Sequence, residues 1–181
     1  NARMPAEKIS YALNTRLPDD IVVQNSCEVP ADFHPRAGKS AKTYEYRILN
    51  RDFRDPTRRL NTYFYHYDLD VNAMQKAASY LEGEHDFKSF CSVHAQVETT
   101  VRTIYKCTVS QKEDEIHIRV TGNGFLYNMV RIIAGTLIEV GAGKCEPEAI
   151  LEMLEAADRQ SAGPTAPAYG LTMIGVEYKD N

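Results

Sequence analysis

Hydrophobic and polar residues alternate along several short stretches of the chain, a pattern typical of strands with one buried face. In residues 43–49, for example, Tyr44 and Tyr46 lie on one side and Glu45 and Arg47 on the other. The same kind of pattern predicts further strands at residues 21–23, 61–67, 101–109, 115–120 and 171–178. The polar residues 111–114 lie between the runs 101–109 and 115–120, so these two runs are predicted to form a hairpin.

Apolar residues at helical spacing predict helices between these strands. Helices are predicted from Pro5 to about Asn14, after Asp70, over 125–138 and from Pro147. Asp70 is a typical N-cap, and the apolar stripe that follows it supplies a buried helix face. Short strands of the antiparallel type with helices between them indicate an α+β fold, a mostly antiparallel sheet covered by helices.

The most apolar of these segments, residues 125–138, contains a single charged residue, Arg131. A guanidinium among apolar side chains requires a carboxylate partner or hydrogen bonds at an opening, because unpaired burial costs several kcal/mol. At helical spacing, Arg131 shares its face with small or polar residues, including Asn128. This asymmetry indicates the wall of a binding cleft; the alternative is a structural arginine paired with Glu139 or Asp158.

Composition restricts the classes of protein to which the chain can belong. Its 181 residues suffice for one domain with an apolar core, and its net charge of −4 argues against indiscriminate nucleic-acid binding. The four cysteines are scattered without a Cys-x-x-Cys pair, which favours reduced thiols in a cytoplasmic protein and no metal centre. No stretch has the length and apolarity of a membrane span or a secretion signal, so no membrane partner is expected.

The charge is nevertheless unevenly distributed. Residues 36–59 contain eight lysines and arginines, beginning with Arg36, against three acids, a net charge of +5. Several tyrosines and phenylalanines lie within or just after this stretch, so cations for phosphates and rings for bases share one region. RNA binding is one interpretation of this basic stretch. A solvated strand edge protected by charge is the other.

A set of short sequence blocks, in a fixed order along nearly the whole chain, resembles one protein family. The blocks are Phe33-His34-Pro35-Arg36, Lys42-Thr43-Tyr44-Glu45-Tyr46, residues 83–90, Val101-Arg102-Thr103-Ile104, residues 122–135, Asp158-Arg159, residues 162–167 and Gly170-Leu171. The family is the TruA family of tRNA pseudouridine synthases. In one place the chain departs from it: Cys91 follows Ser89-Phe90 where many members carry an arginine.

The resemblance implies isomerisation of uridine to pseudouridine at positions 38–40 of the tRNA anticodon arm, without a metal or other cofactor. It also assigns residues. Tyr44 matches the tyrosine that packs on the target base and helps to remove the proton from C5. Arg131 matches the arginine that pairs with the catalytic aspartate, and Leu171 matches the apolar residue that closes the base pocket. Arg36 and Asn128 are further candidates for substrate binding.

In this family the aspartate belongs to a Gly-Arg-Thr-Asp-Ala-Gly motif, and the 181 residues contain no Arg-Thr-Asp. We therefore expect residues 1–3 to be an expression scar, 4–30 a connecting helix and strand from a missing N-terminal half, and 31–181 the C-terminal pseudouridine synthase domain. The parent enzyme is expected to be a homodimer that acts on tRNA, and the isolated chain is expected to be inactive. The alternatives are a non-catalytic RNA-binding module and a protein that does not bind RNA.

Overall fold

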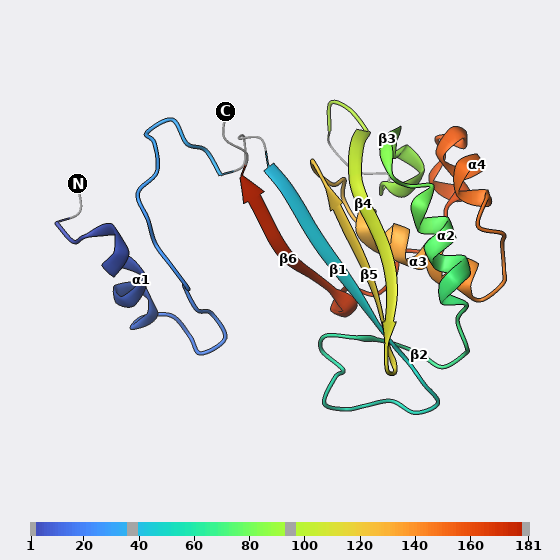
Figure 1. The fold of residues 1–181 in the computed structure, drawn as a ribbon, viewed down its shortest axis with the longest axis horizontal. Helices are drawn as coiled ribbons and strands as arrows, with labels where there is room; N and C mark the ends of the chain where they lie inside the picture. The colour runs from blue at the N-terminus through green and yellow to red at the C-terminus, as the bar shows by residue number, and fades with distance from the viewer. Residues whose placement is uncertain (1–2, 36–39, 93–96, 179–181) are drawn as a thin grey trace. The chain divides into compact units, whose positions relative to one another are not determined.

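The computed structural model describes residues 3–35, 40–92 and 97–178 (Figure 1). The chain divides into two compact units, residues 1–38 and residues 39–181. The first unit contains helix α1 (Ala6–Asn14), which confirms the first predicted helix. The strand predicted at residues 21–23 is wrong. The Asn14 amide accepts a hydrogen bond from the Val23 N–H (2.8 Å) and donates one to the Val23 carbonyl (2.9 Å), so this backbone is satisfied without a neighbouring strand.

The second unit is built on a sheet of six strands in its described part. The strands are β1 (Ser40–Asn50), β2 (Tyr63–Tyr65), β3 (Gly83–Asp86), β4 (Val101–Lys112), β5 (Glu115–Gly122) and β6 (Leu171–Tyr178). Their order is β2-β1-β5-β4-β3, and β6 also pairs with β1. Only the short β1–β2 pairing is parallel; the other pairings are antiparallel, and β4 and β5 form the predicted hairpin.

One edge of β1 is shared by two strands. Residues 40–46 of β1 pair with β6, and residues 48–50 pair with β2. A short 3₁₀ helix, η3 (Ala168–Gly170), leads directly into β6 at this junction. The junction therefore brings the segment before β6 against the middle of β1.

Three helices follow in the second unit, and all lie on the same side of the sheet (Figure 1). They are α2 (Val71–Ser79), α3 (Met129–Gly141) and α4 (Ala149–Ala156), with short 3₁₀ helices η1 (Lys88–Phe90) and η2 (Arg159–Ser161). The predicted cap is confirmed, because the Asp70 carboxylate accepts a hydrogen bond from the Ala73 N–H (2.9 Å). The core lies between these helices and the sheet, with α3 buried along almost its whole length.

Helix α3 begins four residues later than the predicted segment. Asn128, directly before it, has a φ of +61° in the left-handed region, so residues 125–128 lie outside the helix. Arg131 therefore occupies the first turn of α3 instead of its middle. This placement lets its side chain reach the chain segments that pass the helix start.

The fold class is as predicted, an α+β arrangement with a mostly antiparallel sheet covered by helices. Within the described residues, no helix combines the length and apolarity that crossing a membrane requires.

Candidate functional site

Strand β1 turns two tyrosines toward the helices. Tyr46 is fully buried, and its hydroxyl donates a hydrogen bond to the Pro167 carbonyl (2.9 Å). Burial raises the pKa of Tyr46, and the neighbouring Tyr63 adds to this effect, so the phenol stays protonated. Tyr44, two residues earlier on the same face, packs edge-on against Phe125 with ring centroids 5.2 Å apart. Because Tyr44 is only partly buried, its ring can still be contacted from outside.

Leu171 joins this group from the neighbouring strand. It is the cross-strand partner of Tyr46 and packs on the edge of the core. The residue before it must be glycine, because a Cβ on Gly170 would lie 2.7 Å from the Tyr46 ring and 2.9 Å from the Arg47 carbonyl oxygen. The sequence Gly170-Leu171 thus allows the chain to pass closely over Tyr46 before it enters β6.

Arg131 donates two hydrogen bonds to neutral acceptors. Its Nε donates to the Ala166 carbonyl (2.7 Å), and its Nη1 donates to Asn128 Oδ1 (3.0 Å). A second hydrogen bond joins the same two residues, because the Ala166 N–H donates to the Arg131 carbonyl (3.0 Å). The guanidinium also lies near enough to Tyr46 to influence its titration.

No carboxylate of the described residues forms an ion pair with Arg131. The two acids that the sequence suggested as structural partners are engaged elsewhere. Glu139 lies 3.4 Å from Lys144 Nζ, and Asp158 caps η2 by accepting from the Gln160 N–H (3.1 Å). The structure therefore does not support the purely structural ion pair, and part of the guanidinium's hydrogen-bonding capacity is unused within this region.

Two glycines let the segment before β6 lie directly on α3. A Cβ on Gly135 would overlap the Pro164 carbonyl oxygen, and a Cβ on Gly163 would lie 2.7 Å from the Thr136 Cα. The Gly163 N–H donates to the Thr136 hydroxyl (3.0 Å), which fixes the segment on the helix. This close approach carries the Ala166 carbonyl to Arg131.

Asn128 connects Arg131 to a third part of the chain. Its Oδ1 accepts from Arg131, and its Nδ2 donates to the Ser92 hydroxyl (2.9 Å). The Ser92 N–H in turn donates to the Tyr127 carbonyl (3.2 Å). The left-handed backbone of Asn128 is uncommon for a residue other than glycine, although Asn tolerates it better than most. Both ends of the Asn128 amide are therefore occupied inside the protein.

Four of the five site residues predicted from the sequence thus lie in one region. We call this region the Arg131 cluster; it consists of Tyr44, Tyr46, Asn128, Arg131 and Leu171. The fifth, Arg36, lies outside the described residues. Sequence reasoning missed Tyr46, although the alternation along β1 places it on the same face as Tyr44. It also missed the Ala166 carbonyl, for which no side-chain signal exists.

The opposite face of β1 carries a closed ion cluster. Glu45 is only 2% exposed, and its carboxylate accepts hydrogen bonds from Arg47 Nε (2.6 Å) and Arg119 Nε (2.5 Å). His117 Nδ1 lies 3.4 Å from the same carboxylate. Burial alone raises the pKa of Glu45, but the hydrogen bonds from Arg119 and Arg47 outweigh it and lower that pKa to about 2. This acid is therefore ionised and fully engaged.

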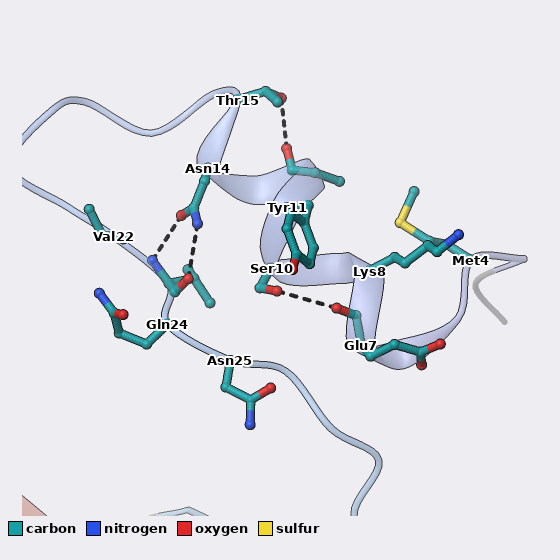
Figure 2. A pocket seen from close by; sticks show the side chains of 12 residues that line it. Met4, Glu7, Lys8, Ser10, Tyr11, Asn14, Thr15, Val22, Gln24 and Asn25 are labelled. Atoms are coloured by element: carbon teal, nitrogen blue, oxygen red, sulfur yellow. Dashed lines mark hydrogen bonds between the residues drawn. The ribbon is translucent and has the colours of Figure 1, made fainter.

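Residues 1–38 contain a separate pocket of about 990 Å³ between α1 and residues 22–25 (Figure 2). Figure 2 shows Asn14 reaching from the helix to the backbone beyond Val22. The lining is mixed and has only one acid, Glu7, and one base, Lys8. None of the predicted site residues lines this pocket, so we assign no chemistry to it. Across the described ranges, no three His, Cys, Asp or Glu side chains form a group that could hold a metal ion.

Comparison with known proteins gives consistent matches. Residues 77–179 match the family model described as tRNA pseudouridine synthase. The chain is 50% identical over 177 residues to tRNA pseudouridine synthase A of Brevibacillus brevis, covering 98% of this chain and 72% of the relative. It is 47% identical over 178 residues to the protein of that name from Thermoanaerobacter sp. (strain X514), covering 98% of this chain and 73% of the relative.

Proposed function

The chain belongs to the tRNA pseudouridine synthase family, and from this membership we propose that the Arg131 cluster receives the target uracil of a tRNA anticodon arm, at positions 38–40. The observation that carries the proposal is a guanidinium that has no carboxylate partner within the described residues and lies near Tyr46, which shares its strand face with the partly exposed Tyr44. An unpaired cation next to an aromatic ring suits an anionic group and a flat base together.

The proposed reaction exchanges one bond to the ribose for another. The bond between uracil N1 and ribose C1′ breaks, the base turns, and a bond forms between C5 and C1′. C5 then loses its proton and N1 gains one, so that product and substrate have the same composition. In this scheme Tyr44 stacks on the base and its hydroxyl assists the removal of the C5 proton. Leu171 closes the apolar side of the base, and the buried Tyr46 supports the floor of the cluster.

Arg131 is proposed to keep the nucleophilic aspartate ionised by pairing with it. The 181 residues contain no Gly-Arg-Thr-Asp, so a polypeptide of these residues alone is proposed to bind tRNA weakly and not to turn it over. Asn128 is proposed to act through Arg131, because both ends of its amide are already occupied by Arg131 and Ser92. Asn128 would thus orient the Arg131 guanidinium and would not itself contact the substrate.

The test is pseudouridine formation in an unmodified anticodon-arm RNA, assayed side by side for these 181 residues and for the full-length product of the gene. Activity only in the full-length product supports the proposed roles of Arg131 and the aspartate. Activity in the 181 residues alone would require another carboxylate as nucleophile and would contradict the site assignment. RNA binding without activity in either protein would favour the non-catalytic RNA-binding module.

We also propose that the full-length protein is a homodimer, an expectation that comes from the family resemblance alone. Light scattering of the full-length protein, free and with tRNA, measures the mass directly. A monomer under both conditions would contradict this part of the proposal without affecting the chemistry.

A further inference from the structure

The structure separates the five described arginines of the basic stretch into two groups. Three arginines of this stretch are neutralised by acids. Arg47 pairs with Glu45 and Arg51 pairs with Asp114 (3.0 Å). Arg58 pairs with three acids, of which Asp114 is the nearest at 2.8 Å. These three arginines therefore have little capacity left for a polyanion, and composition alone could not have distinguished them from the others.

Arg54 and Arg59 form no ion pair with any described residue, and both line one groove of about 330 Å³. The Arg54 guanidinium lies over the Phe64 ring, 4.7 Å from its centroid. Arg59 Nη1 donates to the Pro56 carbonyl (3.0 Å). Each guanidinium keeps further N–H groups for a ligand, because a guanidinium has five. The remaining lining residues are Leu49, Asp55, Pro56, Thr62, Phe64 and Tyr169.

Asp55 is the one acid in the lining, and it repels a bound anion only weakly. Its carboxylate accepts from the Thr57 N–H (2.9 Å) and the Thr57 hydroxyl (2.6 Å), and it pairs with Arg58 (3.3 Å). Hydrogen bonds from Thr57 lower the pKa of Asp55, so the acid is ionised but compensated by its own partners. The groove thus presents two available cations beside aromatic rings.

Tyr169 connects this groove to the Arg131 cluster. Tyr169 is 45% exposed and lies two positions before Leu171 in the sequence. Its ring centroid lies 6.3 Å from that of Tyr63, which in turn lies 6.5 Å from that of Tyr46. A continuous row of rings therefore leads from the groove to the cluster.

We propose that the groove between Arg54, Arg59 and Tyr169 binds tRNA next to the target uridine, with the two guanidiniums on phosphates and Tyr169 stacked on a base. The proposal rests on the proposed function, because it takes the occupant to be the strand that enters the Arg131 cluster. Guanidiniums match phosphate geometry, and an exposed ring accepts any base face. The groove is thus a positioning site that is not selective for sequence.

The experiment measures binding of an anticodon-arm RNA to the full-length protein over a series of KCl concentrations. The variant is Arg54→Gln/Arg59→Gln, and the matched control is Arg51→Gln, from the same loop but ion-paired with Asp114. Each phosphate contact contributes about 0.7 to 0.9 to the slope of log K against log[salt], so the double variant is expected to lower the slope by about 1.4 to 1.8. The control is expected to keep the wild-type slope within about 0.3.

Tyr169→Leu tests the stacking part separately. It is expected to weaken binding about ten-fold while leaving the salt slope unchanged, since stacking involves no phosphate. Circular dichroism and thermal unfolding of each variant verify that it is folded.

A double variant that is folded and keeps the wild-type slope would overturn the groove proposal, as would a wild-type protein that binds no RNA. Pseudouridine formation, assayed on the same samples, separates this proposal from the proposed function. Wild-type turnover with an unchanged slope in the double variant refutes the groove alone. Salt-sensitive binding that the double variant weakens, without turnover in the wild type, supports the groove and refutes the chemistry.

Discussion

The charged residues on the two sides of β1 differ in how completely they are neutralised. On the face turned away from the helices, Glu45 is buried and holds two guanidiniums at hydrogen-bonding distance. On the side toward the helices, the acceptors that the described residues provide for Arg131 are a carbonyl and an amide oxygen. A satisfied ion cluster stabilises a fold, whereas a cation without a counter-ion is available to a ligand or to a further carboxylate. The comparison therefore separates Glu45, whose charge is structural, from Arg131, whose charge we propose to be functional.

The contact between α3 and the segment before β6 is the most sensitive point of the Arg131 face. Gly135→Ala is expected to lower the free energy of unfolding by about 3 kcal/mol or more, because the new Cβ meets the Pro164 carbonyl and backbone must move. The Ala166 carbonyl would then leave Arg131. Urea unfolding measures the loss, and Gly143→Ala is a control, since a Cβ there meets nothing within 4 Å although its φ of +70° adds some strain. A loss below about 1 kcal/mol would mean that the segment adjusts freely.

Glu45 is expected to make the stability of the other face depend on pH. Its folded pKa of about 2 lies below the ordinary 4.5, so its contribution is complete above about pH 4.5 and is lost as the pH falls toward 2. The shift sets an upper bound of about 3 kcal/mol on this contribution, because solvent screens the largely exposed Arg119 side chain. Glu45→Gln is expected to be less stable at pH 7, and the difference from wild type is expected to shrink on acidification.

Urea unfolding at a series of pH values between neutral and acidic tests this expectation. Glu155→Gln, a change at an exposed carboxylate of α4, is the matched control. A stability difference for Glu45→Gln that stays constant with pH would show that the cluster acts through packing and not through charge.

Much of this fold could be predicted from local signals. Alternation located β1, β4, β5 and β6, and the cap at Asp70 located α2, because these patterns depend on residues close in sequence. Two predictions were wrong, because a strand exists only where a partner strand is present and local sequence does not show the partner. One is the strand predicted at residues 21–23, and the other is β3, which was not predicted. The Val23 backbone hydrogen-bonds to the Asn14 side chain, whereas β3 pairs with β4.

Part of the candidate site was also predictable from local sequence. An isolated arginine in an apolar segment is visible in the sequence, and so is a tyrosine on the buried face of a strand. The contacts that hold Arg131 are not visible, because its main acceptor is the backbone carbonyl of a residue 35 positions away. Nor does the sequence show that Asn128 adopts a left-handed backbone conformation and that its side-chain amide hydrogen-bonds to Arg131 and Ser92.

Arg131→Met tests how much the unpaired Arg131 charge contributes to stability. A guanidinium without a carboxylate partner would by itself give a neutral or stabilising change. The structure adds two acceptors that would lose their donor, so we expect a loss of about 1 kcal/mol in the 181-residue chain, partly offset by removal of the charge. Thermal and urea unfolding measure it. A loss above about 3 kcal/mol would show that Arg131 is as structural as Glu45. In the full-length protein the same change is expected to abolish turnover.

Tyr44→Phe is expected to have the smallest effect on stability, within about 0.5 kcal/mol. The ring contact with Phe125 is kept, and the Tyr44 hydroxyl makes no hydrogen bond to the rest of the described chain. If that hydroxyl assists proton removal from C5, turnover by the full-length protein falls about 100-fold or more, while RNA affinity is unchanged. Tyr44→Leu, which removes the aromatic ring, is expected to weaken affinity as well. Equal turnover for wild type and Tyr44→Phe would leave Tyr44 as a stacking surface only, and the helix-facing side of β1 would then contribute shape and not chemistry.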